Sequence, residues 1–65
     1  MQKGGDTVKR RDLIKRLTAA GFRKLRDTGN HAIYKADGFP PISIPRHSEI
    51  NENTAKTILR TARLL

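Results

Sequence analysis

The stretch Gly29-Asn30-His31-Ala32-Ile33-Tyr34 lies at the centre of the segment that decides the fold. The turn-forming pair Thr28-Gly29 separates two runs, Phe22–Asp27 and Asn30–Ala36, and this arrangement predicts a β-hairpin. A second group of turn residues, 37–41, leads to Ile42-Ser43-Ile44, a short alternating segment that predicts a third strand.

The alternation of side chains within these strands predicts which residues share a face. Phe22 and Leu25 are three residues apart rather than two, so we expect a bulge or an early turn in the first strand. His31 and Ile33 fall on one face, with Ile33 expected toward the core and His31 at the open end of its strand. Tyr34 is then expected on the opposite sheet face.

Two amphipathic helices flank the predicted strands. The first begins at about Arg10 and ends before Gly21, because glycine adopts the left-handed conformation of a helix end without strain. The second begins after Asn51, a good N-cap. The apolar positions with helical spacing are Leu13, Ile14, Leu17 and Ala20 in the first helix, and Ala55, Ile58, Leu59 and Ala62 in the second.

Together these elements predict an α+β fold. The expected architecture is a two-layer α-β-β-β-α sandwich, with a three-stranded antiparallel sheet and both helices on one of its faces. We expect residues 1–8 to form a flexible N-terminal tail and residues 9–65 to form a single domain.

Composition excludes several kinds of site. The chain has 65 residues and no cysteine, so it has neither disulfides nor thiolate ligands for a metal. A zinc site would depend on two histidines and a few carboxylates, and we expect no metal and no cofactor. No apolar run approaches the length of a membrane span and no signal-peptide core is evident, so we expect a cytoplasmic protein without membrane contact.

Charge indicates the class of partner. Fourteen Lys and Arg against six Asp and Glu give a formal net charge of +8, and eight of the basic residues lie between Lys9 and Arg26, where Asp12 is the one acid. Such a concentration attracts the phosphates of nucleic acid. The alternatives are a solubilising surface or a surface for an acidic protein partner.

His31 is the candidate catalytic residue, because an imidazole can exchange a proton near neutral pH. The 2′-hydroxyl of RNA is an internal nucleophile, so one histidine can serve as general base while nearby Lys and Arg supply a positive field, and the leaving 5′-oxygen must also be protonated. The alternative is an ordinary surface histidine. His47 is either the general acid of a histidine pair or a structural side chain, and Arg46 is either a phosphate contact or a solvated charge.

Further RNA contacts are expected on the first helix and on the sheet. Lys9, Arg10, Arg11 and Lys15 cluster at and near the start of the helix. Tyr34 either stacks on a base or is a half-buried residue of the sheet.

Three segments resemble the HicA toxins in order and spacing: Lys9-Arg10-Arg11-Asp12-Leu13-Ile14, Gly29-Asn30-His31-Ala32-Ile33-Tyr34 and Pro45-Arg46-His47-Ser48-Glu49-Ile50-Asn51. The resemblance implies a fold like that of a double-stranded-RNA-binding domain, with the first helix approaching an RNA minor groove. It also implies a ribonuclease that cleaves mRNA, a catalytic histidine at His31 and neutralisation by a cognate HicB antitoxin. Asn30 departs from the serine common in the family.

The leading hypothesis is therefore a metal-independent ribonuclease toxin with RNA and a HicB-type antitoxin as partners. A non-catalytic RNA-binding module and a protein-interaction domain are the alternatives. Loss of His31 would abolish cleavage in the first case and change little in the others.

Overall fold

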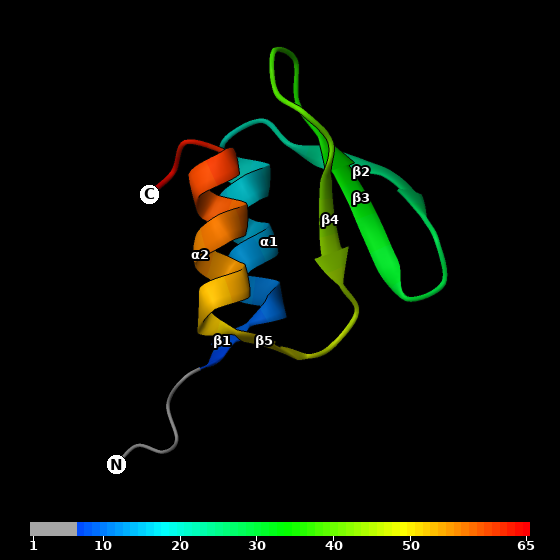
Figure 1. The fold of residues 1–65 in the computed structure, drawn as a ribbon. Coiled ribbons are helices and arrows are strands. Elements are labelled where there is room, and N and C mark those ends of the chain that lie inside the picture. Colours follow the sequence, from blue (N-terminus) through cyan, green and yellow to red (C-terminus); the bar gives the residue numbers. More distant parts are fainter. Residues whose placement is uncertain (1–6) are drawn as a thin grey trace.

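A computed structural model describes residues 7–65 of the chain (Figure 1). Its elements follow in the order β1 (Thr7–Lys9), α1 (Arg10–Ala19), β2 (Arg23–Asp27), β3 (His31–Lys35), β4 (Ile42–Pro45), β5 (Glu49–Asn51) and α2 (Glu52–Thr61). The predicted helices and the three predicted strands are all present.

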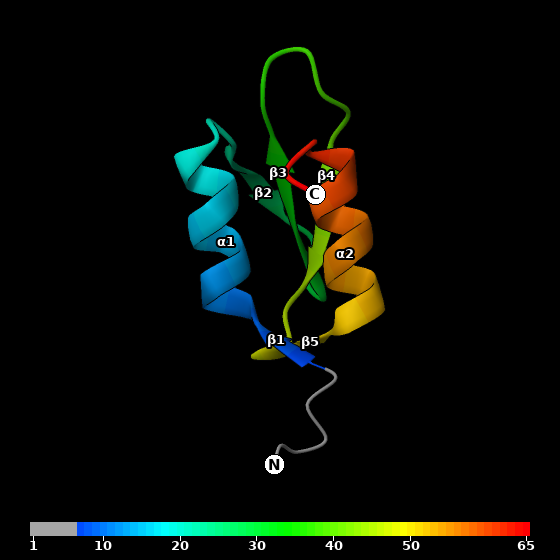
Figure 2. The ribbon, with the colours of Figure 1, turned by 90° about the vertical axis from the view of Figure 1, so that its left-hand side faces the viewer.

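The main sheet is antiparallel and has the strand order β2-β3-β4. Both helices lie on one face of this sheet, side by side, and leave the other face uncovered (Figures 1 and 2). The predicted two-layer α+β architecture is therefore confirmed. Its layout is consistent with that of a double-stranded-RNA-binding domain.

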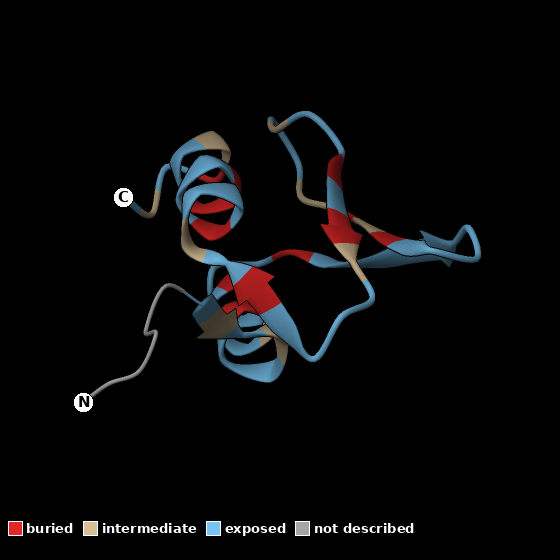
Figure 3. Cartoon of the chain, turned by 60° about the horizontal axis from the view of Figure 1, so that its bottom comes forward, coloured by how far each residue is buried: buried red, intermediate tan, exposed pale blue. Residues whose placement is uncertain are grey.

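The core lies between the helices and the sheet (Figure 3). The four apolar positions predicted for the second helix are all buried. In α1, Leu13 and Leu17 are buried and Ile14 packs against the core, but Ala20 is exposed because the helix has already ended there. The largest fully buried side chains are Phe22, Leu13, Leu17, Ile44 and Ile50.

Each helix has the terminal residue that its sequence predicts. Gly21 follows α1 with φ +100°, and its backbone N–H donates to Thr18 while that of Phe22 donates to Leu17. This pair of bonds is the Schellman pattern, and it directs Phe22 back under the helix into the core. At α2, the side chain of Asn51 accepts a hydrogen bond of 2.8 Å from the backbone of Asn53.

Strands β1 and β5 were not predicted, and they correct the expected extent of the tail. Thr7 and Val8 belong to β1, where they pair with Asn51 and Ile50 of β5 in an antiparallel ribbon. Val8 packs against the core, which explains why this segment is ordered although its neighbours are polar. The remainder of the predicted tail lies outside the described residues.

The predicted faces of β3 are also corrected. Ala32 and Tyr34 point into the core, whereas His31 is exposed and Ile33 is only half-buried on the uncovered face. Alternation assigns residues to two faces without saying which one the helices cover. The small side chain of Ala32 fits directly beneath the helices.

The predicted bulge in β2 is confirmed by a register shift between Lys24 and Arg26. The bulge does not bring Leu25 into the core, however: this side chain is 61% exposed, while Phe22 is buried. As the extra residue of the bulge, Leu25 has no cross-strand partner.

Candidate active site

His31 is the first residue of β3 and is exposed at the open end of the strand, as the sequence predicts. Its backbone is held firmly, because the His31 carbonyl accepts hydrogen bonds from the N–H and the hydroxyl of Thr28, at 2.8 and 3.2 Å. Gly29 takes a positive φ of 78° and so closes the tight turn before the strand. The imidazole is therefore presented from a fixed backbone.

The segment after β4 comes back beside this turn. Pro45 is the cross-strand partner of His31, and the backbone N–H of Arg46 donates to the carbonyl of Asn30 at 3.1 Å. A surface hollow of about 420 Å³ results, lined by Gly29, Asn30, His31, Pro45, Arg46 and His47. Three of the predicted site residues thus line one hollow: His31, and Arg46 and His47, which follow it by 15 and 16 positions in the sequence.

A small charge cluster fixes the Arg46 side chain. Its Nη1 lies 2.6 Å from Oδ1 of Asp27, and Nζ of Lys24 lies 3.0 Å from the other carboxylate oxygen. The hydrogen bond from Lys24 and the charges of Lys24 and Arg46 lower the pKa of Asp27 below its ordinary value. A guanidinium has five N–H donors, so Arg46 can bind a ligand with donors other than the one that it gives to Asp27. The sequence analysis missed Asp27, for which the only signal was an acid at the end of a basic strand.

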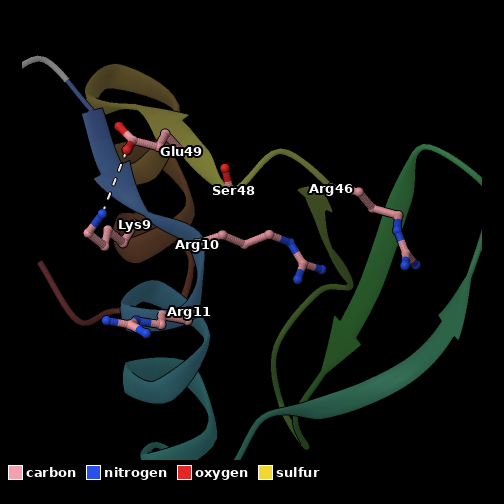
Figure 4. Close-up of a pocket in the computed structure, with 6 residues that line it drawn as sticks. All are labelled: Lys9, Arg10, Arg11, Arg46, Ser48 and Glu49. Atoms are coloured by element: carbon pink, nitrogen blue, oxygen red, sulfur yellow. Dashed lines mark ion pairs between the residues drawn. The ribbon is translucent and has the colours of Figure 1, made fainter.

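A second hollow, of about 480 Å³, adjoins the first through Arg46 (Figure 4). Its lining consists of Lys9, Arg10, Arg11, Arg46, Ser48 and Glu49. Figure 4 shows Arg10 extending from the start of α1 toward β4, whereas Arg46, the residue after β4, extends away from Arg10 toward Asp27 at the end of β2. This hollow therefore extends the positive surface from the histidines to the first helix.

Hydrogen bonds from Arg10 join α1 to the segment that carries the site. Its backbone N–H donates to Ser48 at 2.9 Å, and its side-chain Nε donates to the carbonyl of Pro45 at 2.8 Å. Of the other predicted contacts, Lys9 pairs with Glu49 at 3.7 Å and Arg11 pairs weakly with its neighbour at 4.0 Å. Arg10 is thus the best-anchored cation of this group.

Two predicted RNA contacts do not join the site. Lys15 is exposed on α1 and lines neither hollow. Tyr34 is only 8% exposed and belongs to the core, so its ring cannot stack on a base. The prediction placed Tyr34 on the open face because it assigned Ile33 to the core.

Two further properties concern metal binding and membrane spans. Within residues 7–65, no three His, Cys, Asp or Glu side chains are grouped so that they could bind a metal ion. Neither helix of this part of the chain is long and apolar enough to cross a membrane.

Comparison with known proteins identifies the family of the chain. No curated protein and no solved structure matches it. The family model described as the HicA toxin of bacterial toxin–antitoxin systems matches residues 10–64, which is most of the chain and includes every lining residue of the two hollows except Lys9. The match covers every element of the main sheet and both helices, and on this evidence the chain belongs to the HicA toxin family.

Proposed function

We propose that this HicA toxin is an endoribonuclease that cleaves mRNA without a metal ion, with His31 as its general base. The observation that carries the proposal is the hollow that is lined by His31, Arg46 and His47. An imidazole exposed on a fixed backbone can take a proton from a bound hydroxyl, and a guanidinium beside it can hold a phosphate.

The reaction that suits these groups is transfer of a phosphodiester to the neighbouring 2′-oxygen. His31 takes the proton of the 2′-hydroxyl as the oxygen attacks phosphorus, and the bond from phosphorus to the 5′-oxygen breaks. Arg46 stabilises the negative charge that develops on the phosphoryl oxygens. The products are a 2′,3′-cyclic phosphate and a free 5′-hydroxyl.

The leaving 5′-oxygen needs a proton, and His47 is the candidate donor. It lines the same hollow as His31 and is exposed, so a protonated imidazole there can reach a bound phosphodiester. After one turnover His31 holds a proton and His47 lacks one, and exchange with water restores both.

A HicB-type antitoxin is the proposed protein partner. Family membership supports a toxin–antitoxin pairing in general. The net charge of +8 supports an antitoxin with an acidic contact surface, because opposite charges accelerate association and favour the correct partner. The same charge supports RNA as the substrate.

Single-turnover kinetics on a labelled single-stranded RNA test the catalytic assignment. General acid–base catalysis is typically worth about 100- to 10,000-fold, so His31→Ala should lower the cleavage rate by that factor while RNA affinity changes little. His47→Ala should also lower the rate, and a 5′-leaving group that needs no protonation should restore it. The matched control is Arg60→Gln, an exposed cation at the far end of α2.

Two results would contradict the assignment of His31 as the general base. If wild type and His31→Ala bind RNA equally and neither cleaves it, the domain is a binding module. If both cleave it at the same rate, another residue is the base.

A further inference from the structure

We propose that the uncovered face of the β2-β3-β4 sheet is a binding track for single-stranded RNA that leads to His31. This inference rests on the proposed ribonuclease function and adds a surface that, apart from His31 and Pro45, lies outside both hollows of the site. It differs from binding through the first helix, which the sequence analysis expected.

The register of the strands places the track. Directly opposite residues of an antiparallel pair share a face, and His31, Ile33 and Lys35 alternate with the buried Ala32 and Tyr34. The cross-strand partners on the uncovered face are Arg23 opposite Lys35, Arg26 opposite Ile33, Ser43 opposite Ile33 and Pro45 opposite His31. Neither helix covers this face (Figures 1 and 2).

The charged strand residues on this face have one sign, and the nearby acid Asp37 follows β3 and lines a hollow with Arg23 and Lys35. The strand residues of this face include three cations, Arg23, Arg26 and Lys35, and no acid. Within the described part of the chain, none of the three forms an ion pair with a carboxylate, although Lys35 donates to the carbonyl of Ala36. The only acid of β2, Asp27, pairs with Ala32 and so points to the opposite face.

These cations contrast with others of the chain. Lys9, Arg11, Lys24, Arg46 and Lys56 each lie within 4.0 Å of a carboxylate. Cations that already pair with a carboxylate gain less from a phosphate than cations that face only water. The uncovered sheet face therefore gathers three cations that have no carboxylate partner among the described residues and can accept a polyanion.

The position of His31 at one end of β3 sets the direction in which RNA would run along this face. The imidazole lies at one end of the strand and Lys35 at the other, about 13 Å away at the usual rise per residue. A strand of RNA with its scissile phosphate at His31 would pass Arg26 and then reach Arg23 and Lys35 with phosphates further along. The face therefore contacts nucleotides on one side of the cleavage point.

The chemistry of the face favours contact with the backbone of an unpaired strand. Tyr34 is turned into the core, so beyond His31 the strands of this face present cations and the aliphatic Ile33 but no Phe, Tyr or Trp ring. Without stacking platforms, phosphate contacts dominate and sequence preference is weak. A single strand can follow a sheet face and place its 2′-oxygen in line with the leaving oxygen, which a regular duplex does not allow.

The test is the salt dependence of RNA affinity for matched double variants. Binding of a fluorescent single-stranded RNA is measured in the His31→Ala background, in which the probe stays intact, with Arg23→Gln/Arg26→Gln as the test pair. The matched control, Lys56→Gln/Arg60→Gln on α2, removes the same net charge from exposed positions. All four positions are on the surface, and circular dichroism verifies that the variants fold.

Each phosphate contact of a single strand contributes about 0.7 to the slope of log affinity against log salt. The test pair should therefore make the slope shallower by about 1.4, and in an otherwise wild-type chain it should raise KM with little change in kcat. The control should change neither. The same loss for the pair Arg11→Gln/Lys15→Gln, with none for the sheet pair, would overturn the proposal in favour of the first helix.

Three other results distinguish this inference from a protein interface and from the proposed function. If the sheet pair leaves RNA affinity intact but weakens binding of the antitoxin, the face is a protein interface and the inference is wrong. If wild type cleaves RNA and the sheet pair alters neither KM nor the slope, the inference fails while the proposed function stands. If wild type does not cleave RNA but the sheet pair still makes the salt dependence shallower as expected, the proposed ribonuclease function is wrong and RNA binding by the sheet face stands.

Discussion

Phe22 and Leu25 provide the sharpest test of the packing around β2. Both are large apolar residues three positions apart, yet Phe22 is 1% exposed and Leu25 is 61% exposed. The Phe22 ring also packs against Phe39, with 5.1 Å between ring centroids and an angle of 59° between the planes. Replacing each residue by a smaller aliphatic one should therefore have very different effects on stability.

The expected sizes follow from these contacts. Phe22→Leu loses an aromatic pair, worth about 0.5–1.5 kcal/mol, and leaves a small cavity, so the free energy of unfolding should fall by about 1–2 kcal/mol. For a domain of this size that corresponds to a fall in Tm of roughly 5–15 °C. Leu25→Ala should change the free energy of unfolding by less than about 0.5 kcal/mol, because its side chain is in water.

Thermal unfolding followed by far-ultraviolet circular dichroism measures both changes under identical conditions. A total stability of about 3–9 kcal/mol is typical of a domain of this length, so Phe22→Leu should remain folded at room temperature. Equal losses of stability for the two variants would show that the bulge in β2 turns Leu25 inward, and the register argument for the uncovered face would then fail as well.

Three further predictions concern single side chains. Lys24 and Arg46 lower the pKa of Asp27 in the folded protein, so the ionised carboxylate stabilises the fold above its ordinary pKa, and this stabilisation is lost as the pH falls through the lowered pKa. The acid unfolding of Asp27→Asn should lack this pH-dependent contribution. An acid transition identical to that of wild type would show that the ion pairs of Asp27 do not stabilise the fold. Asn51→Ala removes the cap of α2 and should cost about 1 kcal/mol in urea unfolding, whereas no loss would show that the cap is dispensable. Tyr34→Leu should lower Tm without changing RNA affinity at a temperature where both proteins are folded, because the ring is in the core; an affinity loss of fivefold or more, the least that a stacking contact implies, would place the ring on the RNA.

Much of the fold could be predicted from periodicity and turn residues. The spacing of Ala55, Ile58 and Leu59 identified the buried face of α2, and Gly21 and Asn51 marked helix ends by their backbone and capping chemistry. These signals are local, since each depends on residues a few positions apart.

The errors arose where the answer depends on distant partners. Strands β1 and β5 have three residues each, with Val8 and Ile50 as their only apolar positions, which is too short for a pattern. Their pairing becomes favourable only when the two segments meet beside the helices. The faces of β3 were assigned wrongly because a period of two is symmetric, and the covering helices decide which of Ala32 and Ile33 is inside.

The candidate site was predicted residue by residue but not as an assembly. His31, Arg46 and His47 were each chosen for their chemistry, and the register of β3 against β4, with His31 opposite Pro45, is what brings them into one hollow. The contribution of Asp27 to that hollow depends on its ion pair with Arg46, which no local pattern contains.

The central claim is that His31 serves as the base of a ribonuclease that needs no metal. The most direct measurement is cleavage of a mixed single-stranded RNA by the purified protein in EDTA, comparing wild type with His31→Ala and analysing the ends of the products. We expect cleavage by wild type alone, with 2′,3′-cyclic phosphate and 5′-hydroxyl ends. Cleavage that stops when EDTA is added, or that persists in His31→Ala, would contradict it.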